Sequence, residues 1–230
     1  VRLTSHPGNE TPMTVLLDGN IIFSANIQQD ARYGDFPRGS QIYMIGPEGG
    51  RPEMVTSMQI SNMSVRLDNT VIYEDYKGYE DPLRKHHTSS VTRDIWMYVP
   101  SIDPSEGFRI DGNGTFTKLT SFNGEDRNPV FELGGTAYYY LSEQDGTLNI
   151  YYTDSLHDQL FNGGSIKSKQ VTFYKGNPVR YLSISHNGTL CYSYDGELYT
   201  IKSGGQPEKV DIRIVTDQIE KGSEIQTLTS

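Results

Sequence analysis

TLCYSYDGELYTIK, residues 189–202, contains the pattern that decides the fold. Its two apolar-aromatic runs are each about as long as an ordinary β-strand, and they are bounded by the turn-forming residues Gly, Asn and Asp. Similar runs occur along the whole chain, and no apolar stripe of helical period is sustained over three turns. The chain has 16 tyrosines and only three alanines, which favours strands over helices. We therefore predict an all-β chain.

Three features recur in the same order along the sequence. The first is a hydrophobic-Thr pair that closes a strand: Leu3-Thr4, Val55-Thr56, Leu119-Thr120 and Val171-Thr172. The second is a tight turn between two strands: Asp18-Gly19-Asn20, Asp68-Asn69-Thr70, Gly134-Gly135-Thr136 and Asn187-Gly188-Thr189. The third is an apolar-aromatic strand at 41–44, 94–97, 149–152 and 197–200. Successive hydrophobic-Thr pairs are 52, 64 and 52 residues apart. A repeat of this length is typical of propellers and solenoids.

Each repeat is interpreted as a four-stranded antiparallel sheet. The Gly, Asn and Asp residues supply the positive φ angles that a two-residue hairpin turn needs. A sheet that is apolar on both faces cannot stand alone, so the sheets are expected to stack around an axis as the blades of a β-propeller. A linear solenoid and a pair of sandwiches are the alternatives. We place the four units at about 5–56, 57–120, 121–172 and 173–216 of a single domain, with 217–230 as the lead-in to a further blade.

Composition excludes several classes of protein. The formal net charge of −9 argues against nucleic acid or anionic lipid as the main partner. No stretch approaches the roughly 18 apolar residues of a membrane-spanning helix. The single cysteine, Cys191, cannot form an internal disulfide or a cysteine-based zinc site.

The two ends of the sequence suggest a piece of a longer protein. The chain starts at Val1, its opening VRLT matches the outer strand of a preceding blade, and 209–215 matches the outer strand of the fourth. We expect about four blades of a larger ring, with self-association through uncovered blade edges as a possible consequence.

The turn motif with its flanking strands resembles the TolB-like, WD-type β-propeller repeat, in a degenerate form. Three segments are more specific: YKGYEDPLRKHHTSSVTRDIWMY (76–98), FTKLTSFNGEDRNPVF (116–131) and TLCYSYDGELYTIK (189–202). They resemble the N-terminal propeller of tricorn-like serine peptidases of the Bacteroidetes type. The long loop of the first segment is not a general propeller feature.

The resemblance implies a multidomain peptidase, periplasmic or secreted, in which the propeller precedes a PDZ-like module and a C-terminal catalytic domain. The catalytic serine belongs to that later part, so we expect no catalytic residue in this chain. The resemblance implies a propeller that guides or binds peptides and packs against other domains of the parent protein. The alternative is a stand-alone TolB-like periplasmic propeller that scaffolds protein–protein interactions.

The residues themselves carry no signature of catalysis, cofactor binding or metal binding. No Gly-x-Ser-x-Gly elbow is present, and the adjacent His86 and His87 would point in opposite directions on an extended chain. A propeller glycoside hydrolase ranks last, because the adjacent acids at 80–81 and 125–126 do not show convergence on an axis. Arg127, and Arg93 with Asp94, suit ion pairs that fix loops between blades.

One insert is the candidate contact surface for a peptide or protein partner. Residues 76–93 carry aromatic and basic side chains, which are favoured anchors in binding surfaces. The candidate contact residues are Tyr76, Tyr79, Arg84, Lys85, His86 and His87.

Overall fold

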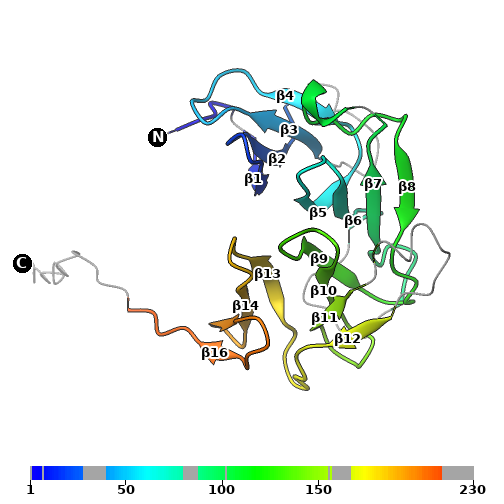
Figure 1. Ribbon diagram of the computed structural model, residues 1–230, viewed down its shortest axis with the longest axis vertical. Helices are drawn as coiled ribbons and strands as arrows, with labels where there is room; N and C mark the ends of the chain where they lie inside the picture. Colours follow the sequence, from blue (N-terminus) through cyan, green and yellow to red (C-terminus); the bar gives the residue numbers. More distant parts are fainter. Residues whose placement is uncertain are drawn as a thin grey trace, which may run out of the picture.

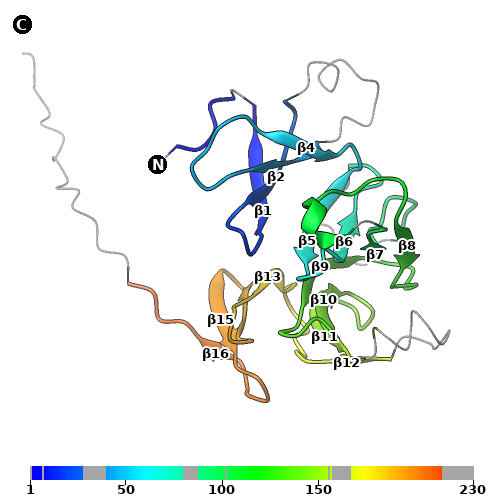
Figure 2. The ribbon, with the colours of Figure 1, turned by 45° about the horizontal axis from the view of Figure 1, so that its top comes forward.

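The computed structural model describes residues 2–6, 8–27, 40–79, 88–101, 103–154, 156 and 167–213. These residues form four antiparallel sheets of four strands each, with one 3-10 turn, η1 (Pro104–Glu106). The sheets stand around a common centre (Figure 1), and the tilted view shows the first and fourth sheets standing apart from the second and third (Figure 2). The predicted all-β propeller with four blades is confirmed.

Consecutive strands pair within every sheet. The first sheet contains β1 (Glu10–Val15), β2 (Ile21–Ala25), β3 (Gln41–Ile45) and β4 (Glu53–Thr56). The second contains β5 (Ile60–Val65), β6 (Val71–Asp75), β7 (Ile95–Val99) and β8 (Thr115–Lys118). The third contains β9 (Asp126–Phe131), β10 (Tyr138–Ser142), β11 (Asn149–Thr153) and β12 (Ser168–Gln170). The fourth contains β13 (Arg180–Ile184), β14 (Leu190–Tyr194), β15 (Glu197–Ile201) and β16 (Glu208–Lys209).

The first strand of each sheet lies nearest the centre and the fourth lies at the periphery (Figure 1). The inner strand β5 contacts β1 on one side and β9 on the other, and β9 also contacts β13. Neighbouring blades therefore meet along their inner strands.

Core side chains fill the spaces between sheets. In β6, Val71 and Tyr73 join the cluster shared with Ile22 and Ile42 of the first sheet. The intervening Ile72 joins a cluster with Tyr138 and other aromatics of the third sheet. Because successive side chains of a strand point to opposite faces, one strand serves two interfaces. A third cluster joins the third and fourth sheets through Leu141, Ile150, Leu190, Tyr192 and Ile201.

The expectation that every sheet is apolar on both faces is wrong for the fourth. Its row Ile184, Leu190 and Ile201 is apolar, whereas the next row across the sheet is Ser183, Cys191 and Thr200. The three apolar side chains belong to, or pack against, the cluster shared with the third sheet. The small, polar row requires no covering sheet for its stability.

The repeated turns differ from the two-residue hairpins that the sequence suggested. In the first sheet, Leu16 and Asn20 close a three-residue loop, and the Gly19 N–H donates to the Leu16 carbonyl at 3.0 Å. Gly19 has φ +84°, and Asn69 and Gly188 hold the same left-handed position in their repeats. This geometry is that of a type I turn followed by one left-handed residue. A two-residue loop occurs instead at Asp195-Gly196, between β14 and β15.

The hydrophobic-Thr pairs have a structural role at the outer strands. The buried Thr172 hydroxyl accepts a hydrogen bond from the Ile150 N–H at 2.9 Å and donates to Asn149 Oδ1 at 3.0 Å. Thr120 accepts in the same way from the Ile95 N–H at 3.0 Å. The hydroxyl therefore satisfies a backbone donor near the start of the third strand.

The end of the fourth sheet is shorter than predicted. The outer strand β16 is Glu208–Lys209, and the Val210 N–H adds one bond to the Leu198 carbonyl at 2.9 Å. The predicted strand at 209–215 thus overlaps β16 at Lys209, and the predicted lead-in at 217–230 lies outside the described residues. Across the described chain, no helix is long and apolar enough to cross a membrane.

Candidate functional site

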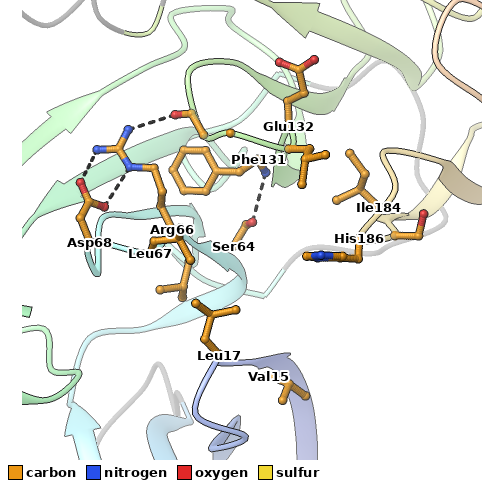
Figure 3. A pocket seen from close by; sticks show the side chains of 15 residues that line it. Val15, Leu17, Ser64, Arg66, Leu67, Asp68, Phe131, Glu132, Ile184 and His186 are labelled. Carbon is orange, nitrogen blue, oxygen red and sulfur yellow. Dashed lines mark hydrogen bonds and ion pairs between the residues drawn. The ribbon is translucent and has the colours of Figure 1, made fainter.

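The turns that follow the four inner strands surround one cavity of about 550 Å³. All four sheets contribute to its lining: Val15 and Leu17 from the first, 64–68 from the second, 131–135 from the third and 184–186 from the fourth. Figure 3 shows these side chains around the opening. A cavity of this size lies within the range of about 300–1,000 Å³ typical of ligand pockets.

Three leucines occupy the same position of the repeat, the first residue of the loop that follows the inner strand. Leu17 is 81% exposed, Leu67 is 73% exposed and Leu133 is 61% exposed. In the fourth repeat the position is His186, which is also exposed. We call Val15, Leu17, Leu67, Leu133 and Ile184 the leucine mouth. Exposed apolar side chains gathered around a cavity with a polar rim mark an interaction surface.

Arg66 joins the second and third sheets at this mouth (Figure 3). Its Nε and Nη2 donate to the two carboxylate oxygens of Asp68 at 2.9 and 2.5 Å, and Nη1 donates to the Gly135 carbonyl at 3.0 Å. The guanidinium also lies 5.9 Å from the centre of the Phe131 ring. The Arg66 hydrogen bond holds the pKa of Asp68 at about 2, so Asp68 is ionised and the pair is fixed at physiological pH.

The close approach of Arg66 requires glycine at position 135. Gly135 has φ +70°, and a Cβ there would lie 2.2 Å from Arg66 Cδ. Beside it, the Ser64 hydroxyl accepts a hydrogen bond from the Phe131 N–H at 3.1 Å (Figure 3). The turns of the second and third sheets are therefore held together, and this fixes the positions of Leu67 and Leu133 relative to each other.

The arrangement is suited to binding. Its apolar side chains can enclose a hydrophobic side chain, and its donors and acceptors at the rim can meet a peptide backbone. Within the described ranges, no group of three or more His, Cys, Asp and Glu side chains is placed to hold a metal ion.

The candidate contact insert is only partly described. Tyr79 is 72% exposed, whereas Tyr76 is half-buried with the Arg93 guanidinium 5.4 Å from the centre of its ring. Arg84, Lys85, His86 and His87 lie outside the described residues. The structure brings neither tyrosine to the leucine mouth.

The predicted ion pairs of the arginines occur, with one change of partner. Arg127 Nε lies 2.7 Å from Glu125 Oε2, and both side chains are largely buried. Arg93 pairs with the fully buried Glu74, while the adjacent Asp94 pairs with Lys77 and Lys118. The pairs of Arg93 and Asp94 lie within the second sheet, and only the Arg127–Glu125 pair holds a segment between two blades.

Sequence reasoning missed the leucine mouth. The signal was the leucine before the turn in three repeats, which the turn motif already contained at Leu17, Leu67 and Leu133. An isolated exposed leucine carries no information, and only the placement of the three around one axis makes a surface.

Solved structures with the same architecture include tricorn protease, with a TM-score of 0.67 and 18% identity over 91% of this chain. A putative TolB from Agrobacterium tumefaciens aligns with a TM-score of 0.55 and 18% identity over 85% of this chain. TolB from Acinetobacter baumannii aligns with a TM-score of 0.56 and 15% identity over 90%. The fold shared with these structures is a β-propeller.

This propeller spans less than two thirds of each of those proteins. It covers 18% of the tricorn chain, 62% of the Agrobacterium chain and 44% of the Acinetobacter chain. At such identities the likeness concerns the fold alone. No protein-family model and no curated protein matches the sequence.

Proposed function

We propose that this propeller is a non-catalytic module that binds peptide segments at the leucine mouth. One observation carries the proposal: three leucines at one repeat position stand 61–81% exposed around a single cavity. Leaving such side chains in water is unfavourable, and each leucine gains about 1.5–3 kcal/mol when fully buried. A partner that supplies an apolar side chain recovers part of this free energy.

The finer assignment follows the resemblance of the sequence. The module belongs to a tricorn-like serine peptidase of the Bacteroidetes type, periplasmic or secreted, and guides peptides towards a catalytic domain elsewhere in the parent chain. The similarity in fold to tricorn protease supports this assignment. It predicts that the reading frame continues beyond Ser230 into a PDZ-like module and a catalytic domain.

The second candidate is a stand-alone propeller that scaffolds protein partners. The similarity to two TolB structures favours it, because this chain covers a larger share of them. It predicts a reading frame that ends soon after a fifth or sixth blade.

The binding proposal is tested with a fluorescein-labelled decapeptide of Gly and Ser with two central leucines. Fluorescence anisotropy should detect binding, and replacing both leucines by serine should weaken it at least tenfold. The double variant Leu67→Asp, Leu133→Asp should have the same effect on the leucine peptide. Both positions are exposed, so the variant is expected to fold.

The matched control is Ile212→Asp, at an exposed aliphatic residue (55%) that does not line the mouth. It should change the affinity less than twofold. Binding that ignores the leucine mouth substitutions, or no binding of the leucine peptide, would overturn the proposal.

A further inference from the structure

A second cavity of about 170 Å³ lies towards the other ends of three of these inner strands, β5, β9 and β13. The strand β9 carries Arg127 and Asn128 at this cavity and ends with Phe131 at the leucine mouth. In the same way β13 carries Arg180 here and Ile184 at the mouth. The two cavities are therefore separated by about four residues of strand, or about 13 Å at roughly 3.3 Å per residue.

Three guanidinium groups and one carboxylate line this cavity, which we call the arginine pocket. Arg93 is paired with Glu74, and Arg127 is paired with Glu125 behind the pocket. Arg180 is half-buried, and its side chain makes no hydrogen bond or ion pair with any residue of the described chain. An unpaired and partly desolvated arginine is a costly feature, because the guanidinium has lost part of its hydration without gaining a carboxylate partner.

A second donor near Arg180 is also unsatisfied. Arg93 Nε is buried and has no hydrogen-bond partner among the described residues. The only lining carboxylate, Glu74, already accepts three hydrogen bonds: from Arg93, from Asn62 Nδ2 at 2.7 Å and from the Asn128 N–H at 3.0 Å. The pocket thus holds more donors than its own acceptor can serve, which fits an external anion.

The backbone around the pocket is strained in two places. Asn128 has φ +47° and Tyr181 has φ +56°, each at an irregularity in its inner strand. A left-handed tyrosine is uncommon, and such conformations cost about 1–3 kcal/mol and concentrate at functional sites. The Tyr181 side chain is 76% exposed, so core packing does not explain its conformation. It remains available to cover a ligand in the pocket.

We propose that the arginine pocket binds the carboxylate of an Asp or Glu side chain in the peptide that occupies the leucine mouth. This rests on the proposed function and specifies the peptide: an acidic residue about four positions from an apolar one, in extended conformation. The pocket has space for roughly six water molecules at about 30 Å³ each, which suits a side chain entering from the axis. Arginine presents two parallel donors to a carboxylate, so Arg180 gains the partner that it lacks.

The test compares four labelled decapeptides, each with the two leucines of the first experiment. The first has Asp four positions from a leucine and an amidated C-terminus, and the second has Asn in place of Asp. The third has Asn and a free C-terminal carboxylate, and the fourth has Asp adjacent to the leucines. The first peptide should bind about tenfold more tightly than the second and the fourth.

Variants of the protein localise the effect. Arg180→Gln should remove the preference for Asp over Asn and leave the affinity for the Asn peptide unchanged. Arg180→Lys should retain part of the preference, because it keeps the charge without the paired donors. The control Arg213→Gln, at an exposed arginine outside the pocket, should leave the preference intact.

The outcomes separate this inference from the proposed function. Equal affinity for the Asp and Asn peptides, with binding still dependent on the leucines, would overturn the acidic site alone. A preference for the free C-terminus over the internal Asp would also overturn it, since the ligand would then be a chain end. No binding of any leucine peptide would overturn the proposed function itself. A preference that survives in a folded Arg180→Gln protein, judged by circular dichroism, would place the site elsewhere.

Discussion

Among single residues, Asp126 at the start of β9 is a carboxylate buried at a cost. Asp126 is 1% exposed, and neither carboxylate oxygen has a hydrogen-bond partner in the described chain. Burial raises its pKa to about 7; the hydroxyls of Ser142 and Thr120 oppose the shift without forming a hydrogen bond of normal geometry, and the charges of Asp94 and Glu125 add to it. The folded protein therefore holds a proton on Asp126 that the unfolded chain releases at lower pH.

This proton makes stability depend on pH with a defined sign. The contribution of Asp126 is complete below its ordinary pKa of 3.8 and is lost as the pH rises through about 7. Asp126→Asn removes this titration, so we expect a flatter pH profile and a gain of about 1–3 kcal/mol in unfolding free energy at pH 8.5. Urea unfolding at pH 5.5 and 8.5 measures the pH dependence of the unfolding free energy and the gain at pH 8.5.

The control for this prediction is Asp211→Asn, the same change at an exposed aspartate. This substitution should leave the pH dependence of the unfolding free energy the same as in the unsubstituted protein. An Asp126→Asn profile with an unchanged slope would show that Asp126 is not the titrating group.

Among elements, a buried threonine adds a side-chain hydrogen bond to the pairing of the third strand with the outer strand in each of the second and third sheets. Thr172 is 1% exposed and binds both the Ile150 N–H and Asn149 Oδ1. Asn149 Oδ1 in turn accepts from the Tyr174 N–H at 2.9 Å, and Asn149 Nδ2 donates to the Tyr174 carbonyl at 3.0 Å. The hydroxyl thus joins β11 to the segment that leads away from β12.

Thr172→Val keeps the shape of the side chain and removes the hydroxyl. The Ile150 N–H would then be buried without an acceptor, so we expect a loss of about 1–3 kcal/mol in unfolding free energy. Chemical denaturation measures it. Thr200→Val, on the polar row of the fourth sheet, is the matched control and should change stability by less than about 0.5 kcal/mol. Equal effects of the two substitutions would contradict the role assigned to the Thr172 hydroxyl.

Across the whole molecule, the blades are joined by polar ties as well as by apolar clusters. Glu74 of β6 is 0% exposed and accepts from Asn62 and Arg93 of its own blade and from the Asn128 N–H of the next. Ser64 and Arg66 make the corresponding tie at the leucine mouth. The second and third sheets are therefore fixed to each other near both ends of their inner strands.

Glu74→Ala removes the acceptor of three donors and leaves Arg93 without its ion-pair partner. We expect a loss of about 3–5 kcal/mol in unfolding free energy, as for breaking a buried ion pair by removing one partner. Hydrogen exchange should show faster exchange in β9 as well as in β5 and β6, because the tie crosses the blade boundary. Glu53→Ala, at an exposed position of β4, is the control and should be near neutral. Increased exchange confined to the second sheet would argue against a tie between blades.

The sequence by itself determined the all-β class, the four repeats and the third strand of each, because strand period, turn residues and aromatic positions are local properties of the chain. It also indicated the ion pairs of Arg93 and Arg127, though not the partner of Arg93. Only the tertiary structure placed Leu17, Leu67 and Leu133 around one cavity and Arg180 beside Arg93 and Arg127. It also placed the polar row on the fourth sheet and the unpaired carboxylate at Asp126. These features arise where different blades meet, and the distance between residues of different blades depends on how the sheets pack, which no local pattern encodes.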